Sequence, residues 1–472
     1  MSEDGPTANE SVNEETPLLD DAVRKHEEVY NRFTPAQKRT ITALISLAGL
    51  LPLFVSGTFI PSIPQIAKDL NTTGSVVNVA VSLSIFANAF GSLFWATYSG
   101  YYGRKPIYLT SIAFEAVGSF GVAISRSVPQ LLVCRVVQAF GASSGLSVGV
   151  GVIGDIYKLE ERGGASGIFF SAVLLGAALA PLVGGTTSHY YTWRAMQFGL
   201  SGFAVFCWFM TLFLQPETSQ PGARGIDKAR AAGEKRNWVW LNPLRSLGLL
   251  RSPNVLFLAL EGAFVLLTDY GLVVPIAFTI GKRYGIHNEA LLGALCIPLG
   301  VGNFVGAPLS GWLSDRIIVK WRKRRGGTWV PEDRLRAALS GAAIMVPCSV
   351  LFSGLVTQFV PGRLGLVLNL GALFVNGLGV DFVLTPSTAY IVDILHQRSA
   401  EATAASMCFR GILIALCVAF ILPAIETFGV AATNGALAVM AWVGFGLVWS
   451  VVKYGDKFRA WVDVGFTDLK NN

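Results

Sequence analysis

Twelve long apolar segments constrain this chain more than any other feature of its sequence. Each has roughly the 17 to 25 residues that a helix needs to cross a bilayer, and polar stretches separate them. Only 14% of the residues are charged, against about 25% in soluble proteins. A helix satisfies its own backbone hydrogen bonds in lipid, and an open strand does not. The sequence therefore predicts an all-α polytopic membrane protein with twelve transmembrane helices, near 41–63, 76–98, 107–125, 129–154, 164–188, 195–214, 254–280, 290–312, 337–357, 364–391, 402–424 and 430–452.

The lysines and arginines fall mainly in alternate loops. With the N-terminus inside, 20 of the 37 lie in the five inward loops and six in the outward loops. Because cytoplasmic loops retain these residues, both termini are predicted to be cytoplasmic. The net charge of +7 is then a topology signal, and no nucleic-acid partner is expected.

The longest polar break, 216–253, divides the twelve segments into six and six. A shift of 215 positions lays Gly91 on Gly306 and Ser99 on Ser314, and lays the turn SGYYGRKP on GWLSDRIIVK. Such repetition is typical of transporters with two pseudo-symmetric halves and a site between them. The predicted parts are a disordered cytoplasmic N-terminal tail (1–40), a six-helix half (41–215), a cytoplasmic linker (216–253), a second six-helix half (254–452) and a cytoplasmic C-terminal tail (453–472).

Several short motifs occur in an order that one transporter family shares. GWLSDR (Gly311 to Arg316) and YGRK (Tyr102 to Lys105) match two parts of that family's loop signature. RVVQAFGAS, from Arg135, resembles its fourth-helix motif, and GAALAPLVGG, from Gly176, its fifth-helix antiporter motif. With PET after the sixth segment, the chain resembles the major facilitator superfamily, in its fungal drug:proton antiporter branch with twelve spans.

The resemblance implies roles for individual residues. The gating turns would use Gly103, Arg104 and Lys105 in the first half and Gly311, Asp315 and Arg316 in the second. The antiporter motif would use Gly176, Pro181, Gly184 and Gly185. The chain departs from the family where Gly100 and Tyr101 replace an Asp-Arg pair, so the latch between the halves is expected to depend more on Asp315 and Arg316.

Two enzyme-like patterns lie in the fourth segment. GLSVG (Gly145 to Gly149) fits a hydrolase elbow and GVGVIG (Gly149 to Gly154) fits a dinucleotide turn, but both need a strand before them. The spacing of four between Gly141, Gly145 and Gly149 predicts a packing face instead. The sequence also lacks zinc-type cysteine spacing. No enzyme activity, cofactor or metal is therefore expected.

Charges inside the segments are few, and each costs at least about 2.5 kcal/mol at the bilayer centre. Arg135 lies three residues before Gln138 on one predicted helix face. Arginine keeps its own proton, so a carboxylate must carry the proton that is transported. Glu115 and Asp269 are the carboxylates that lie deepest in their segments. A structural salt bridge is an equal alternative for each carboxylate. The candidates for the substrate and proton pathway are Arg135, Gln138, Glu115, Glu261, Asp269, Asn376, Asp381 and Arg410, with Asn88, Trp95, Asn303, Asn369 and Tyr390 as further cavity residues.

The first functional hypothesis is a proton-coupled antiporter that exports drugs or secondary metabolites by alternating access. A second is an exporter of organic acid anions such as itaconate or citrate, which Arg135 and Arg410 would clamp. A third is a vacuolar amino-acid or small-molecule transporter, because EETPLL (Glu14, Leu18, Leu19) resembles an acidic dileucine sorting signal. A transporter-like nutrient sensor is a further alternative. The expected partners are a small-molecule substrate, protons and the lipid bilayer, with a sorting adaptor as a further candidate. The protein is expected to be a monomer in the plasma membrane, with the vacuolar or endosomal membrane as the alternative.

Overall fold

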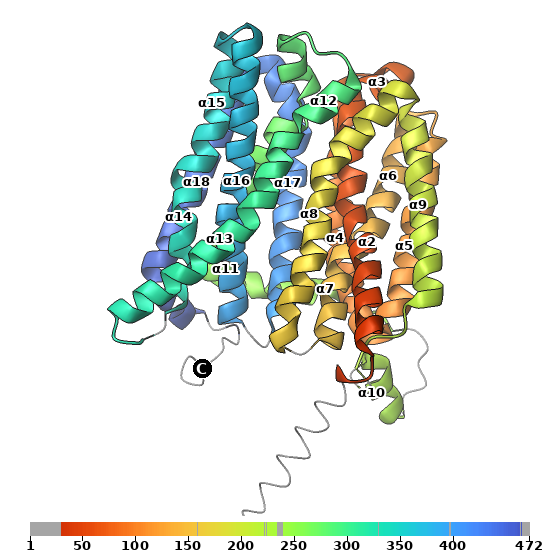
Figure 1. Ribbon diagram of the computed structural model, residues 1–472, viewed down its shortest axis with the longest axis vertical. Coiled ribbons are helices and arrows are strands. Elements are labelled where there is room, and N and C mark those ends of the chain that lie inside the picture. The colour runs from red at the N-terminus through yellow and green to blue at the C-terminus, as the bar shows by residue number, and fades with distance from the viewer. Residues whose placement is uncertain are drawn as a thin grey trace, which may run out of the picture.

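The computed structural model describes residues 30–464, apart from residues 158, 221, 223, 234–238, 329, 396, 397 and 463. Its described secondary structure is helical, and the described residues contain twelve spans, each a single helix or a run of consecutive helices, that are long and apolar enough to cross a membrane. They stand side by side, with the start of α2 (Pro35–Phe59) and the end of α18 (Val430–Trp461) at the same end of the bundle (Figure 1). We call this the terminal end and the opposite one the far end. The predicted sorting residues Glu14, Leu18 and Leu19 lie outside the described residues.

The first half contains spans one to six. Its helices are α2 (Pro35–Phe59), η1 (Ile60–Ser62), α3 (Ile63–Asp69), α4 (Gly74–Tyr102), α5 (Arg104–Ala123), α6 (Val128–Ala142), α7 (Ser144–Ile156), α8 (Leu159–Tyr190) and α9 (Trp193–Leu214). Span one consists of α2, η1 and α3, and span four of α6 and α7. Thr34 begins α2 with a capping box, in which its hydroxyl accepts from the Gln37 amide and the Gln37 side chain accepts from the Thr34 amide.

The linker and the second half follow. They contain α10 (Gly225–Ala231), η2 (Pro243–Arg251), α11 (Pro253–Val273), η3 (Ala277–Gly281), α12 (Glu289–Leu295), α13 (Ile297–Arg324), η4 (Pro331–Ala337), α14 (Ala338–Ser340), η5 (Gly341–Met345), α15 (Val346–Phe359), α16 (Gly362–Ile394), α17 (Ser399–Phe428) and α18 (Val430–Trp461). Gly429 joins α17 to α18 directly, with the positive φ of 85° that favours glycine.

Three boundaries differ from those expected from hydropathy. The helix of span one begins at Pro35, within the predicted tail, and α18 continues to Trp461, past the predicted tail start at 453. In span eight, α13 runs unbroken to Arg324. GWLSDR is therefore helical and not a turn, which corrects the predicted second gating loop. Lysine and arginine are good helix formers, so a helix continues through charges that end an apolar segment.

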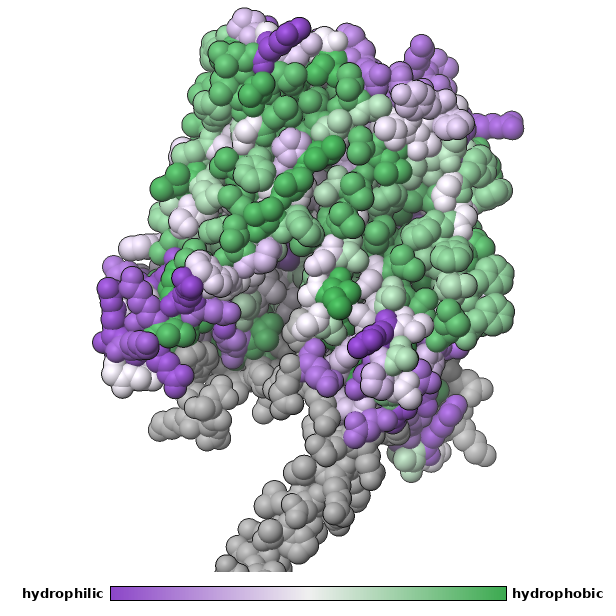
Figure 2. All heavy atoms as spheres, in the orientation of Figure 1, coloured by the Kyte–Doolittle hydropathy of each residue, from purple (hydrophilic) through white to green (hydrophobic). Residues whose placement is uncertain are grey.

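The two halves contact each other most visibly at the far end. His189 of α8 lies 3.3 Å from Glu289 of α12, and Ser75 of α4 donates to Glu426 of α17 at 3.1 Å. One turn below Ser75, the Asn78 amide donates to the Val418 carbonyl at 2.7 Å. At the terminal end, Figure 2 shows a hollow between the two lobes, beside their hydrophilic surfaces. The structure is thus closed at the far end and open at the terminal end.

Candidate functional site

Arg135 lies in α6 in the interior of the first half, with none of its surface exposed. Its Nη1 donates to Gln138 Oε1 at 2.7 Å and to the carbonyl of Val55 in α2 at 3.3 Å. Its guanidinium carbon is 4.2 Å from the centre of the Phe59 ring, also in span one. The predicted charge of span four is therefore buried against a second helix of its own half.

Gln138 connects Arg135 to a carboxylate. Its Nε2 donates to Ser119 Oγ at 2.8 Å, and the Ser119 hydroxyl donates to Glu115 Oε1 at 3.2 Å. A further hydrogen bond of 2.9 Å runs from the same Nε2 to Gln197 Oε1 in α9. We call these five side chains, which are at most 2% exposed, the first-half network. It brings together the predicted Arg135, Gln138 and Glu115, through two residues that the sequence did not single out.

The hydrogen bonds of the first-half network point in one direction. A guanidinium has no acceptor, so the amide oxygen of Gln138 faces Arg135 and its NH₂ group faces Ser119 and Gln197. The Ser119 hydroxyl then donates to Glu115. Such a directed series of hydrogen bonds connects the guanidinium of Arg135 to the carboxyl group of Glu115 without direct contact between them. Arg135 Nε and Nη2 and Glu115 Oε2 are buried and have no hydrogen-bond partner among the described residues.

The second half holds its acidic groups differently. Asp269 of α11 accepts one long hydrogen bond of 3.4 Å from Asn303 of α13, and Asp381 of α16 is near enough to Asp269 to repel it electrostatically. All three side chains are partly exposed, in contrast to the first-half network. Within the described part of the chain, neither aspartate forms an ion pair. We call Asp269, Asn303 and Asp381 the aspartate group.

Glu261 and Arg410 form a separate pair in the second half. Glu261 has no exposed surface and lies in α11 beside Gly444 of α18. Arg410 of α17 lies against Gly262, so the two charges interact, although their charged atoms are not within 4.0 Å. This places Arg410 toward α11 of its own half. Arg135 contacts span one of the first half instead, and the clamp of these two arginines around an anion stays a prediction.

Four other predicted cavity residues hold helices together. Asn376 exchanges hydrogen bonds with Thr268 and donates to Ser349 at 3.0 Å, and it is fully buried. Asn369 accepts from Ser353 at 2.7 Å. The remaining two are Trp95, whose Nε1 donates to the Phe140 carbonyl, and Tyr390, which donates to Glu332 beside Arg459. Tyr390 therefore belongs to an ion cluster near the terminal end and not to the cavity. Asn88 of α4 is partly exposed.

The first gating turn is a single residue, Gly103, between α4 and α5. Its φ of 110° favours glycine, and an added Cβ would lie 2.5 Å from Glu217 Oε2. Glu217 accepts from the backbone amides of Arg104 at 2.9 Å and Lys105 at 3.3 Å. It is the glutamate of PET, so the tripeptide that marked a resemblance supplies the anion that caps α5. The function of Glu217 was missed because the residues it caps lie more than 110 positions away.

Arg104 and Asp155 form the ion pair of this region. The Arg104 Nε donates to Asp155 at the end of α7 at 2.8 Å, and its Nη1 donates to Ser99 at 2.8 Å. In the second half, Arg334 makes the corresponding contacts, to Asp393 at the end of α16 at 2.7 Å and to Asp315 at 3.3 Å. In each half, an arginine therefore pairs with an aspartate at the terminal end of one span. This is span four in the first half and span ten in the second.

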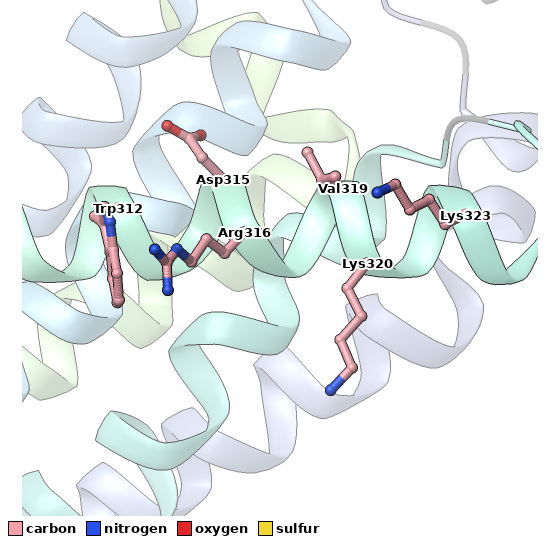
Figure 3. A pocket seen from close by; sticks show the side chains of 6 residues that line it. All are labelled: Trp312, Asp315, Arg316, Val319, Lys320 and Lys323. Atoms are coloured by element: carbon pink, nitrogen blue, oxygen red, sulfur yellow. The ribbon is translucent and has the colours of Figure 1, made fainter.

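The side chains of the second gating segment spread around α13. Asp315 points away from Lys320, and Arg316 stacks on Trp312 of the same helix, 3.7 Å from its ring centre (Figure 3). The side chain of Asp315 is 73% exposed. Gly311 has open space around it. Asp315 and Arg316 thus contact residues of their own half, Arg334 and Trp312.

Small residues determine how closely α6, α7 and α8 approach their neighbours. A Cβ on Gly145 would lie 2.2 Å from the Ala48 carbonyl oxygen, and one on Gly141 would lie 2.3 Å from the Glu115 nitrogen. The predicted packing role of this glycine series is confirmed. In the antiporter motif, Gly176 faces Leu50 and Gly184 faces the Thr58 backbone, both in span one.

The same motif also faces the second half. A Cβ on Gly185 would lie 2.2 Å from the Glu289 carbonyl oxygen of α12. The Pro181 carbonyl lies against Gly293 of α12, 2.1 Å from where its Cβ would be. The motif is thus packed between span one of its own half and span eight of the other.

Comparison with known proteins agrees with this geometry. The sequence model of the Major Facilitator Superfamily matches residues 45–418. The chain is 27% identical over 445 residues to "Efflux pump radE" of Floropilus chiversii, across 90% of this chain and 82% of that protein. It is 22% identical over 555 residues to "MFS antiporter QDR3" of Candida albicans, across 90% of this chain and 79% of that protein.

A solved structure shows the same fold. The crystal structure of the human organic anion transporter MFSD10 (TETRAN) superposes with a TM-score of 0.54 at 16% identity, across 88% of this chain and 100% of that chain. The family consists of transporters and not of enzymes, and its members carry small molecules across a membrane. With twelve spans, a family match over most of its length and fungal efflux pumps and antiporters among its relatives, this chain belongs to the major facilitator superfamily.

Proposed function

We propose that this protein is a proton-coupled antiporter that exports small organic compounds, with both termini in the cytoplasm. The observation that carries the proposal is the contrast between the two walls of the interior. Glu115 is buried in a hydrogen-bonded network with Arg135, whereas Asp269 is partly exposed and has one weak contact. A carboxylate that must take up and release protons needs access to water, so Asp269 is the proton carrier in this proposal.

Alternating access then follows from the closed far end and the open terminal end. A substrate enters from the terminal end, and the halves rock about the central residues until the far end opens. A proton that binds there returns the carrier to the starting state. In an antiporter, substrate and proton exclude each other from one charged group, and Asp269 is placed for that exchange.

The test compares Asp269→Asn with Glu115→Gln in proteoliposomes. We expect Asp269→Asn to lose transport driven by a pH gradient, by at least tenfold, while exchange of substrate across the two faces continues. Glu115→Gln keeps the network's shape, and we expect gradient-driven transport within about threefold of the unsubstituted protein. Gradient-driven flux that survives in Asp269→Asn and disappears in Glu115→Gln would reverse the assignment.

A second candidate function is export of an organic anion such as itaconate or citrate. The observation in its favour is that Arg135 keeps Nε and Nη2 unpartnered, since this edge of a guanidinium can bind a carboxylate through two hydrogen bonds. Anion export requires Arg135, which is buried here, to become accessible to the substrate in another conformation of the protein. Inhibition by di- and tricarboxylates that Arg135→Lys abolishes would support it.

For location, we propose a monomer in the plasma membrane, with the vacuolar or endosomal membrane as the alternative. The alternative rests on the EETPLL sequence, through which Leu18 and Leu19 would bind a sorting adaptor. We expect a fluorescent fusion to stay at the plasma membrane whether or not Leu18 and Leu19 are changed to alanine. Internal fluorescence that moves to the plasma membrane in the double variant would establish the sorting signal instead.

A further inference from the structure

The terminal end of α13 presents three basic side chains on one exposed face. Arg316, Lys320 and Lys323 follow one another at spacings of four and three residues, so they lie on the same side of the helix. A cavity there has a volume of about 570 Å³, within the roughly 300–1,000 Å³ of pockets that hold small molecules (Figure 3). We call it the α13 basic pocket, and its lining consists of these three residues with Trp312, Asp315 and Val319.

The positive charge of the α13 basic pocket is not neutralised within the described part of the chain. There, none of Arg316, Lys320 and Lys323 forms an ion pair. The one carboxylate in the lining, Asp315, pairs with Arg334 at 3.3 Å and points away from Lys320 (Figure 3). The pocket therefore offers three cations to a ligand, and this favours an anion.

Apolar surface leads into the pocket along the same helix. The side chains of Trp312 and Val319 are more than half exposed. Leu309 and Val301, three and eleven residues before Trp312, are also exposed and continue this face toward the middle of span eight. Another side of α13, at Gly306, packs on α16. A face that is apolar along the span and basic at its terminal end matches a phospholipid, whose acyl chains and headgroup differ in the same way.

Trp312 holds Arg316 at the level where the apolar face ends. The guanidinium carbon of Arg316 lies 3.7 Å from the centre of the Trp312 ring. Tryptophan is enriched at the boundary between hydrocarbon and headgroups, and lysine extends its charged end from apolar surface toward the headgroups. A stacked guanidinium keeps its N–H edge for a phosphate, which arginine binds through two hydrogen bonds. Both position and chemistry therefore correspond to a lipid phosphate.

The length of the basic face indicates the kind of headgroup. Arg316 and Lys323 are seven residues apart, which is about 10 Å along the helix axis. Phosphates at two or more positions of a headgroup cover this length better than one phosphate does. We propose that the α13 basic pocket binds an anionic phospholipid with several phosphates on its headgroup, such as phosphatidylinositol bisphosphate, through Arg316, Lys320 and Lys323.

This lipid site goes beyond the proposed transport function and shares only its orientation. With both termini in the cytoplasm, the terminal end of α13 lies at the cytoplasmic leaflet, which carries the anionic lipids of a membrane. Figure 2 shows hydrophilic side chains gathered at this end of the second half, below a hydrophobic band. The headgroup then lies against the basic side chains and the acyl chains lie along Trp312 and Leu309.

The test counts lipids bound to the purified full-length protein by native mass spectrometry. Dioctanoyl phosphatidylinositol bisphosphate is compared with dioctanoyl phosphatidylserine, which has the same acyl chains and a single phosphate. We expect the bisphosphate lipid to bind at least tenfold more tightly. Lys320→Gln and Lys323→Gln should each weaken its binding at least fivefold. The matched control is Arg322→Gln, which removes an exposed charge of the same helix outside the pocket and should change binding by less than twofold.

A soluble headgroup separates a lipid site from a site for free phosphates. Inositol trisphosphate carries the phosphates without acyl chains, so we expect it to compete at least tenfold more weakly than the lipid. Lys320→Arg and Lys323→Arg keep the charge and should bind the lipid within about twofold of the unsubstituted protein. Because these positions are exposed, the unfolding temperature of each variant should stay unchanged.

Three results would each overturn the proposal. They are equal binding of phosphatidylserine, equal competition by inositol trisphosphate, and equal losses in Arg322→Gln and the two pocket variants. The last would mean that diffuse positive charge attracts the lipid without a pocket. Lipid binding is measured without substrate or pH gradient, so a failure of proton-driven transport would reject the antiporter and leave the lipid site standing.

Discussion

At the scale of single residues, burial alone does not separate structural charges from functional ones. Arg135 has no exposed surface, yet its Nη1 has two acceptors, and Gln138 and Ser119 connect it to Glu115 by hydrogen bonds. Asp269 is less deeply buried and has a single 3.4 Å hydrogen bond. The several hydrogen bonds around Arg135 stabilise one arrangement of helices, whereas the single long hydrogen bond of Asp269 constrains its side chain less.

Gln138 should therefore be a stabilising residue. Gln138→Ala removes the acceptor for a buried guanidinium and the donor to Ser119, so we expect the free energy of unfolding to fall by about 1–3 kcal/mol. Thermal unfolding in detergent measures this. Gln130→Ala, at the exposed start of the same helix, is the control and should change stability by less than about 0.5 kcal/mol. Equal effects of the two changes would show that the network adds no stability.

At the scale of elements, the start of α5 depends on a residue from beyond span six. Glu217 holds the first backbone amides of α5 and lies where a side chain on Gly103 would collide with it. A carboxylate at a helix N-terminus satisfies orphan donors and faces the positive end of the helix dipole. The cap therefore links the turn between spans two and three to the segment after span six.

Glu217→Ala should lower the free energy of unfolding by about 1–2 kcal/mol, as expected for loss of a helix cap. Glu217→Gln keeps an acceptor oxygen and should cost less than the alanine variant. The control is Glu161→Gln, an acidic side chain near the same end of the first half that is 56% exposed. If Glu217→Ala unfolds at the same temperature as the Glu161 variant, Glu217 does not cap α5.

At the scale of the whole molecule, two adjacent glycines of α8 pack against different halves. Gly184 packs on span one within its own half, and Gly185 packs on the Glu289 backbone of the other half. In the proposed alternating access, the halves rock as rigid units, so the first contact persists and the second exists only while the far end is closed. The antiporter motif thus combines folding within a half with closure between the halves.

Gly185→Ala should open the far end, because its methyl group would lie about 2.2 Å from the Glu289 carbonyl oxygen in the closed state. Gly184→Ala should lower the unfolding temperature and leave the balance of states unchanged. Distances between spin labels at Tyr191 and Arg363, exposed far-end positions in different halves, report closure once the native cysteines are replaced. The same distance distribution in both variants would contradict this division of roles.

Hydropathy and motif patterns were enough to predict the lipid environment, the twelve spans and the family, because apolar length and short motifs are local properties of the chain. They also identified Arg135, Glu115 and Asp269 as unusual, since charge in lipid is costly wherever it occurs, and Gln138 through its spacing from Arg135. The partners of these residues were known only once the helices were placed against each other. The contacts of Ser119 and Gln197, the Glu217 cap and the aspartate group on three helices join residues far apart in sequence, and no local pattern encodes which helix faces which. The helical course of GWLSDR was likewise missed because charge ends an apolar segment without ending a helix.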